Sequence, residues 1–365
     1  MALLLSALSL VGLAFIAWLT VDGLLAIARR RRAEQSRRPR RLRVAARSEV
    51  AGELLCLQLV AADGKPLPAF AAGQHLLLGA PAGRNGSTIR RAYSLAAWNP
   101  APSAYALGIK REAQGAMTQW LWQHLQPGTE IEASPPQGNF VLDSAPEPLV
   151  LIGGGIGITP MRAMLHAALA AGRPVTLFQL ARDQASLLYG EEFAMLATRH
   201  SQFTYWPQLS RPADDWSGAR GRIDAAQIID VLGGSAGRFY LCAGNAVMDA
   251  LQAGLVGQGV DAAAIHREAF GAAGGAGLSG LRLAVEQGGR EQVFATAGEP
   301  TLLAALEANA VALPSECRAG SCGQCAVRLA EGEVDWLVQP EHPVGDGEIL
   351  PCVCTARSNL RLAVA

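Results

Sequence analysis

Residues 317–325 read Cys317-Arg318-Ala319-Gly320-Ser321-Cys322-Gly323-Gln324-Cys325 and decide how the last part of this 365-residue chain folds. The three cysteines have C-x4-C-x2-C spacing, and Cys352 follows downstream. The residues between them are small, so the backbone can wrap closely around a bound group and direct its N–H groups at sulfur. Zinc sites usually add a second pair of cysteines or histidines, and Cys56 and Cys242 are too isolated for a disulfide framework. The pattern therefore favours four thiolates that hold an iron–sulfur cluster.

The same spacing resembles that of plant-type ferredoxins, which bind a 2Fe-2S cluster. The resemblance implies four metal ligands, which are Cys317, Cys322, Cys325 and Cys352. Cys354 is the alternative fourth ligand. Cys352 is preferred because Leu350-Pro351-Cys352 precedes a short final strand, where the ferredoxin pattern has its last cysteine. Two β-like runs, a helical run at 301–310 and then the cluster loop predict an α+β, β-grasp ferredoxin domain over residues 281–365.

The N-terminal part of the chain is apolar and then strongly basic. Residues 2–28 carry one charge, Asp22, and nine arginines lie between Arg29 and Arg43. This predicts a transmembrane helix over residues 1–28, followed by a basic juxtamembrane linker over residues 29–41. The positive-inside rule then places the catalytic domains in the cytoplasm, as in a single-pass protein of a bacterial inner membrane. Directly behind a membrane span, the arginines are expected to contact anionic lipid and not nucleic acid.

Residues 42–145 contain short β-like runs separated by turn residues, which predict an antiparallel β-barrel. Within this region lies Arg91-Ala92-Tyr93-Ser94-Leu95. A tyrosine offers a flat face to an isoalloxazine ring, and a serine hydroxyl can hydrogen-bond the N5 edge, where a hydride arrives. An arginine can pair with a phosphate. These residue types are compatible with a flavin, and the run resembles the R-x-Y-S flavin motif of the ferredoxin-NADP reductase superfamily.

Two further motifs follow in the same region. Gly115-Ala116-Met117-Thr118 opens a helical segment whose first N–H groups could bind a pyrophosphate, and Pro136-Gln137-Gly138-Asn139-Phe140 closes the barrel. With R-x-Y-S, they resemble the flavin domain of the ferredoxin-NADP reductase superfamily. Lys110-Arg111-Glu112 is more similar to the FAD-binding branch than to the FMN-binding one, so FAD is expected. The resemblance implies flavin contacts from Arg91, Tyr93, Ser94, Leu95, Lys110, Gly115, Ala116, Met117 and Thr118.

Residues 146–270 change to an α/β pattern. An apolar strand at 148–152 runs into Gly153-Gly154-Gly155-Ile156-Gly157-Ile158-Thr159-Pro160 and then a helical segment. Such a turn predicts a pyrophosphate cradle, because glycines allow close backbone approach and the helix dipole favours an anion. It resembles the G-G-x-G-x-T-P turn of the same superfamily. The resemblance implies an α/β nucleotide-binding domain with coenzyme contacts from Gly154, Gly155, Gly157, Thr159 and Pro160.

Two later segments resemble the rest of that nicotinamide domain. Cys242 ends an apolar strand, where the superfamily has a cysteine against the nicotinamide, although Ala243-Gly244-Asn245 replaces its Gly-Pro turn. His266-Arg267-Glu268-Ala269-Phe270 resembles the closing E-x-F, in which Phe270 would contact a cofactor. For Cys242 alone, a buried structural thiol is an equally good interpretation. The resemblance implies that the catalytic residues are Tyr93, Ser94, Cys242 and Glu268.

The choice of coenzyme depends on the residues that follow the strand at 175–180. Arg182 could pair with the 2′-phosphate of NADPH, whereas Asp183 would repel it. NADH and NADPH both remain open from the sequence, with a slight preference for NADH.

A glycine-rich linker at 271–280 separates the nicotinamide and ferredoxin domains. From residue 42 to 365 the chain resembles the reductase components of bacterial oxygenases and hydroxylases. This implies a membrane-anchored, NAD(P)H-dependent oxidoreductase that passes electrons through FAD and the 2Fe-2S cluster to an oxygenase, hydroxylase or desaturase partner. The alternatives are a terminal reductase of quinone, ferric iron or a small oxidant, and a redox sensor that does not turn over.

Overall fold

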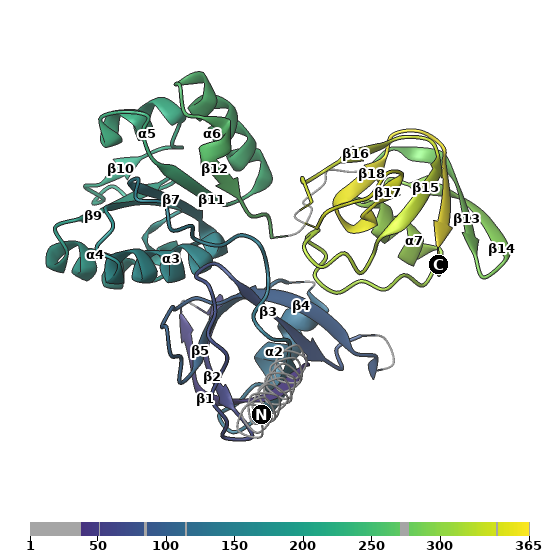
Figure 1. Ribbon diagram of the computed structural model, residues 1–365, viewed down its shortest axis with the longest axis horizontal. Coiled ribbons are helices and arrows are strands. Elements are labelled where there is room, and N and C mark those ends of the chain that lie inside the picture. The colour runs from purple at the N-terminus through teal and green to yellow at the C-terminus, as the bar shows by residue number, and fades with distance from the viewer. Residues whose placement is uncertain are drawn as a thin grey trace, which may run out of the picture.

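The structure, a computed structural model, describes residues 38–364 apart from residues 51, 84, 85, 114, 271–276 and 341. Figure 1 shows three bodies in chain order, coloured purple to blue, teal to green, and yellow. The predicted transmembrane helix and most of the basic linker lie outside the described residues. Within the described ranges, no helix is long and apolar enough to cross a bilayer.

The first body is an antiparallel barrel. Its described strands form a six-stranded sheet in the order β4-β3-β6-β1-β2-β5, and a bridge between Leu95 and Leu107 joins the two ends. Apolar side chains such as Leu42 and Val44, two residues apart on β1, fill the interior. The elements are β1 Arg40–Val50, β2 Leu54–Ala61, β3 His75–Ala80, β4 Ile89–Ser94, β5 Tyr105–Lys110, α2 Ala116–His124 and β6 Glu130–Ala133.

The second body is a parallel sheet with helices on both faces. Its described strands run in the order β10-β9-β8-β7-β11-β12. Leu149 and Leu151 of β7 pack toward α3 and α4, whereas Val150 and Ile152 pack toward α5 and α6. Both faces of the strand are thus buried, as is usual for a parallel sheet. The elements are β7 Leu149–Gly154, α3 Ile158–Ala170, β8 Val175–Ala181, α4 Gly190–Arg199, β9 Phe203–Leu209, β10 Ala219–Arg220, α5 Ala225–Leu232, β11 Arg238–Cys242, α6 Asn245–Gly257 and β12 Ile265–Arg267.

The third body is a mixed sheet, with described strands in the order β14-β13-β19-β15-β17, and a separate β16-β18 pair. Helix α7 packs its leucines into the same core as β13 and β19. Strand β13 begins at Ser279, inside the predicted linker. The elements are β13 Ser279–Gln287, β14 Arg290–Ala297, α7 Leu302–Ala308, β15 Val327–Glu331, β16 Val334–Trp336, β17 Glu348–Ile349, β18 Cys354–Ala356 and β19 Leu360–Val364.

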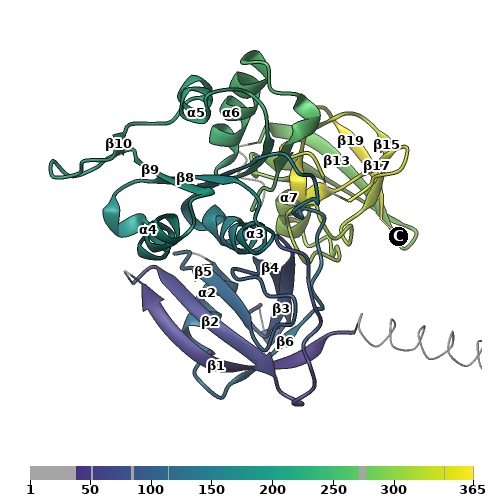
Figure 2. The same cartoon turned by 60° about the vertical axis from the view of Figure 1, so that its left-hand side comes forward.

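The three bodies contact one another. Arg162 of α3 donates from Nη1 to the carbonyl oxygen of Ala96 at 2.6 Å, and Figure 2 shows α3 lying over the barrel. Arg90 of β4 forms an ion pair with Glu316, directly before the cluster loop, at 3.7 Å between Nη1 and Oε1. The ends of the parallel strands, one side of the barrel and the cluster loop are therefore brought together.

Candidate functional site

A cavity of about 500 Å³ lies where the three bodies meet. Strand β4 contributes Arg91, Tyr93 and Ser94 to its lining. The start of α2 adds residues 115–118, and the segment after β12 adds residues 268–270. The cluster loop, residues 317–321, closes the cavity from the ferredoxin body.

The chemistry of this lining fits a flavin. Burial raises the pKa of the Tyr93 phenol above its usual value, so the ring is neutral and can pack on another ring. Ser94 is 5% exposed and pairs across the sheet with His75. Arg91 supplies a guanidinium for a phosphate. An aromatic face, a hydroxyl and a cation thus line one cavity.

The turn before α2 is shaped for an anion. The Thr118 hydroxyl donates to the carbonyl oxygen of Gly115 at 3.0 Å and accepts from the Glu112 N–H at 3.2 Å, which closes the turn. A Cβ on Gly115 would lie 2.6 Å from Thr118 Oγ1 and 2.8 Å from Glu112 Cβ, so the tight turn requires glycine. The first N–H groups of α2 have no intrahelical partner and are available to a pyrophosphate.

The structure brings almost all of the predicted flavin residues to this cavity. Leu95 is the exception, because it is 0% exposed in the barrel core and the cavity lining does not include it. Thr159, predicted as a coenzyme contact, lines the flavin cavity instead, and Phe270 and Glu268 line it as well. Leu95 follows β4 and bridges to Leu107 of β5, which places its side chain in the barrel core.

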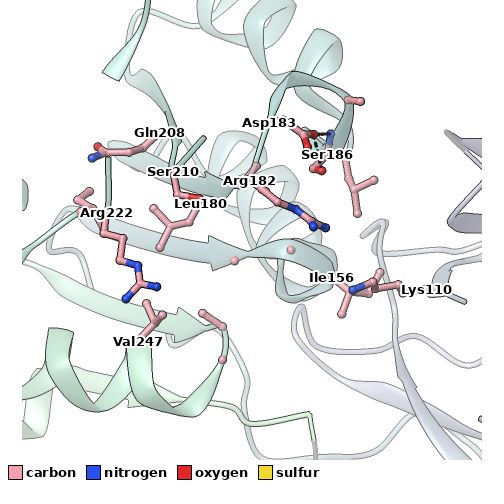
Figure 3. Close-up of a pocket in the computed structure, with 18 of the residues that line it drawn as sticks. Lys110, Ile156, Leu180, Arg182, Asp183, Ser186, Gln208, Ser210, Arg222 and Val247 are labelled. Carbon is pink, nitrogen blue, oxygen red and sulfur yellow. Dashed lines mark hydrogen bonds between the residues drawn. The ribbon is translucent and has the colours of Figure 1, made fainter. Parts of the chain in front are cut away.

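A second cavity, of about 850 Å³, lies at the carboxyl ends of the parallel strands. Gly154 and Gly155 line it at the end of β7, and Arg182 lines it after β8. It shares Lys110 and Ile156 with the flavin cavity, so a coenzyme bound here can reach the flavin. Figure 3 shows Lys110 and Ile156 together at the barrel side of this cavity.

The other predicted coenzyme residues, Gly157, Pro160 and Cys242, pack in or beneath the glycine turn and do not face the cavity. A Cβ on Gly157 would lie 2.0 Å from the carbonyl oxygen of Cys242, so β11 and the turn are in direct contact. Cys242 is 1% exposed within an apolar core, and Pro160 is buried in α3. None of these three residues lines either cavity. The position of Cys242 favours the structural-thiol interpretation over a catalytic one.

Arg182 and Asp183 both line this cavity. The Asp183 carboxylate accepts hydrogen bonds from the Ser186 N–H at 3.0 Å and hydroxyl at 2.7 Å, whereas the Arg182 guanidinium points into the cavity (Figure 3). Ser210 and Arg222 line the same cavity. The sequence analysis did not identify them, although each lies just after a strand of the parallel sheet, where ligand-binding residues are common.

The four predicted metal ligands lie as two pairs. Cys317 is hydrogen-bonded to Cys322, and Cys325 is hydrogen-bonded to Cys352. Among the described residues, no group of three or more histidine, cysteine, aspartate or glutamate side chains is arranged to bind a single metal ion. A 2Fe-2S cluster has two irons and four thiolates, two on each iron, so the paired arrangement fits it.

The loop around these thiols leaves little room for side chains. Gly323 has φ +71° and a Cβ there would lie 2.4 Å from the His342 ring. The Ala319 N–H donates to the Cys317 sulfur at 3.4 Å, as the small residues of the loop predict. Cys354 instead packs among apolar side chains of the ferredoxin core. The structure thus groups Cys352, and not Cys354, with the cluster loop.

Two residues without a motif of their own, His75 and Arg318, also line the flavin cavity. His75 is 3% exposed, its Nε2 has no hydrogen-bond partner among the described residues, and burial lowers its pKa. Neither residue had a separate signal in the sequence. His75 begins the apolar strand β3 and Arg318 lies between two metal ligands, and each reaches the cavity only through packing between distant segments.

Comparison with known proteins agrees with this arrangement. The chain is 30% identical over 331 residues to phenoxybenzoate dioxygenase subunit beta from Ectopseudomonas oleovorans, which covers 89% of this chain and 97% of that protein. It is 28% identical over 324 residues to phthalate dioxygenase reductase from Burkholderia cepacia, covering 87% and 95%. The chain belongs to the phthalate dioxygenase reductase type of oxygenase reductase components.

The family assignment extends to each body and to the fold. Residues 42–142 match the oxidoreductase FAD-binding domain, residues 151–253 the oxidoreductase NAD-binding domain, and residues 285–357 the 2Fe-2S iron-sulfur cluster binding domain. A solved phthalate dioxygenase reductase structure aligns with a TM-score of 0.65 at 27% identity, over 90% of this chain and 99% of that one. A flavohemoprotein from Pseudomonas aeruginosa, 34% identical over 194 residues, is matched over only 49% of its length.

The chain is therefore an oxidoreductase of the phthalate dioxygenase reductase type, which transfers electrons from NAD(P)H through FAD to a 2Fe-2S cluster. A flavin accepts two electrons as a hydride and releases them singly, which a one-electron cluster requires. The protein supplies the geometry. Lys110 and Ile156 lie where the two cavities join. Tyr93 and Ser94 line the cavity that would hold the flavin, and Cys317 lines the same cavity.

Proposed function

We propose that this reductase works at a membrane surface and serves an oxygenase, hydroxylase or desaturase held in the same bilayer. The observation that carries the proposal is the apolar run at residues 2–28, followed at once by nine arginines up to Arg43. An apolar segment of this length can span a bilayer, and the arginines would hold its end at the anionic cytoplasmic face. Anchoring raises the effective concentration of an acceptor in the same membrane.

The ferredoxin body offers a surface for such an acceptor. Residues 281–365 contain eleven acidic residues and six arginines. Glu331, Glu333 and Asp335 are exposed together around the turn from β15 to β16. An acidic surface on this body would steer a basic partner into contact. The oxygenase systems named for the relatives support this class of acceptor.

Membrane anchoring can be tested on the full chain. We expect wild-type protein to stay with bacterial membranes after alkaline carbonate washing. Leu13→Arg, which places a charge in the middle of the apolar run, should release it, whereas Leu13→Ala should not. NAD(P)H-driven ferricyanide reduction should be equal in all three proteins. Wild-type protein that washes off as freely as Leu13→Arg would contradict the anchor.

A terminal reductase of quinone, ferric iron or a small oxidant is the second candidate. It is favoured only if electrons leave from the flavin. An anaerobic titration with NADH and, separately, NADPH would follow flavin absorbance and the electron paramagnetic resonance of frozen samples. We expect flavin bleaching together with a reduced 2Fe-2S signal. Flavin bleaching without that signal would move the terminal reductase ahead.

A further inference from the structure

The ferredoxin body contributes part of the flavin cavity. Its cluster loop adds Cys317, Arg318, Ala319 and Ser321 to the lining, and of these four only Arg318 carries a positive charge. The same cavity contains Arg91 from the barrel. Two guanidinium groups from different bodies therefore border one cavity.

These two cations disfavour each other. Burial lowers the pKa of Arg91, and the charge of Arg318 lowers it further. Arg318 pairs through Nη2 with Glu307 of α7, but its Nε is buried without a hydrogen-bond partner among the described residues. Like charges in a partly buried cavity repel more strongly than in water. An anion between the two guanidiniums would remove the repulsion and supply the acceptor that Arg318 Nε lacks.

The backbone holds Arg318 in an unusual conformation. Its φ is +56°, in the left-handed region that residues other than glycine rarely adopt. Such strain persists where the surrounding structure imposes it, often at binding sites. On the preceding side, Glu316 pairs with Arg90 at 3.7 Å, and Arg90 also donates to Glu132 at 2.6 Å. The loop is thus fixed to β4 next to Arg91.

We propose that Arg318 belongs to the flavin site, where its guanidinium and that of Arg91 bind a phosphate of the flavin from opposite sides of the domain boundary. Guanidinium groups bind phosphate through paired, charge-assisted hydrogen bonds, and a flavin phosphate is the anion that this cavity is built to receive. The flavin then joins the ferredoxin body to the barrel. By linkage, flavin binding and ferredoxin docking stabilise each other.

The inference rests on flavin binding at this cavity and is tested by flavin affinity, not by turnover. Apoprotein freed of flavin, with its cluster intact, is titrated with FAD, FMN and riboflavin by flavin fluorescence. Arg318→Gln should raise the Kd for FAD and FMN by about tenfold or more, the cost of a lost charge-assisted hydrogen bond. The Kd for riboflavin, which has no phosphate, should stay unchanged. Arg91→Gln should give the same pattern.

Arg328→Gln is the matched control, because Arg328 is an exposed arginine of the same body on β15 and lines neither cavity. It should leave all three affinities unchanged. If Arg318→Gln loses iron, Arg318→Lys takes its place and should give a smaller loss, confined to FAD and FMN. Unchanged FAD affinity, or an equal loss for riboflavin, would overturn the role of Arg318. Absence of FAD binding by wild-type protein would instead overturn the flavin function itself.

Discussion

Cys352 and Cys354 are two residues apart but have different surroundings. Cys352 lies in the short helix Pro351–Val353 and its thiol is hydrogen-bonded to Cys325. Cys354 lies in β18, where it pairs with Trp336 of the neighbouring strand β16, and it is 0% exposed in the ferredoxin core. Only Cys352 is therefore placed to bind a cluster.

We expect Cys352→Ser to abolish the absorbance and electron paramagnetic resonance of the cluster, because one of the four thiolates is lost. Flavin reduction by NAD(P)H and ferricyanide reduction should persist. Cys354→Ala should keep the cluster signals and destabilise the chain by about 1 kcal/mol through lost packing. Cluster loss in Cys354→Ala alone would exchange the two assignments.

Arg182, Ser210 and Arg222 change the expectation for the coenzyme. Arg182 and Asp183 both line the coenzyme cavity, and the hydrogen bonds from Ser186 lower the pKa of the Asp183 carboxyl and keep it charged. Figure 3 shows Arg222 in the same cavity as Ser210. A cation and a hydroxyl at this end suit the extra phosphate of NADPH.

We expect NADPH to be preferred, and Arg222→Ala to lower kcat/KM for NADPH by about tenfold with little change for NADH, as loss of one charge-assisted contact implies. Binding of 2′,5′-ADP against 5′-ADP, measured by calorimetry, checks the same contact without turnover. Arg211→Ala is the control, since Arg211 is exposed and lines neither cavity. An equal decrease of kcat/KM for both coenzymes would indicate that Arg222 contacts the pyrophosphate instead.

At the scale of elements, the turn from β7 to α3 depends on two glycines for different reasons. Gly155 has φ +56°, and a Cβ there would meet nothing within 4 Å. A Cβ on Gly157 would lie 2.0 Å from a backbone oxygen of β11. The first glycine provides a backbone conformation, and the second allows a close approach between elements.

Gly157→Ala should therefore be the more damaging substitution. Its methyl group would force β11 and the turn apart, whereas Gly155→Ala adds only left-handed strain of about 1–2 kcal/mol. We expect Gly157→Ala to lower the calorimetric transition temperature of the chain more than Gly155→Ala does, and to raise the KM for the coenzyme. Equal transition temperatures would show that the turn relaxes freely.

For the whole molecule, the position of the cluster loop against the barrel matters most. The Arg90–Glu316 ion pair crosses this boundary, with side chains 35% and 31% exposed. A partly exposed pair of this kind contributes about 0.2–1 kcal/mol and is screened by salt. It is suited to an interface that holds the ferredoxin body near the flavin and still releases it.

Glu316→Gln should slow electron transfer from flavin to cluster about two- to fivefold, the equivalent of losing one such pair. Stopped-flow absorbance after mixing with the coenzyme measures this step. The wild-type rate should fall with added salt, and the variant should depend less on salt. Glu333→Gln is the control, because Glu333 forms an exposed ion pair with Arg357 of the same body and does not cross the boundary to the barrel. An unchanged rate in Glu316→Gln would show that the pair does not hold the docked state.

Much of the fold could be predicted because its signals are local. The cluster spacing, the R-x-Y-S run and the glycine turn each place several functional residues within about ten positions, where short segments fix relative geometry. The three family matches and the solved reductase structure agree with the bodies that these motifs indicated. The errors of placement also have a local cause. Leu95 follows a strand and Cys242 ends one, and both side chains pack into apolar cores and not into a cavity.

The sequence by itself determined the kind of cofactors and the order of the domains, since ligand spacing and strand periodicity are properties of contiguous residues. Tertiary structure alone decided which residues share a cavity. Arg318 and Arg91 are 227 positions apart and meet only because the cluster loop packs on β4. Cys352 and Cys354 are likewise distinguished by burial in different cores. Contacts between segments distant in the chain depend on the packing of whole bodies, which no local pattern encodes.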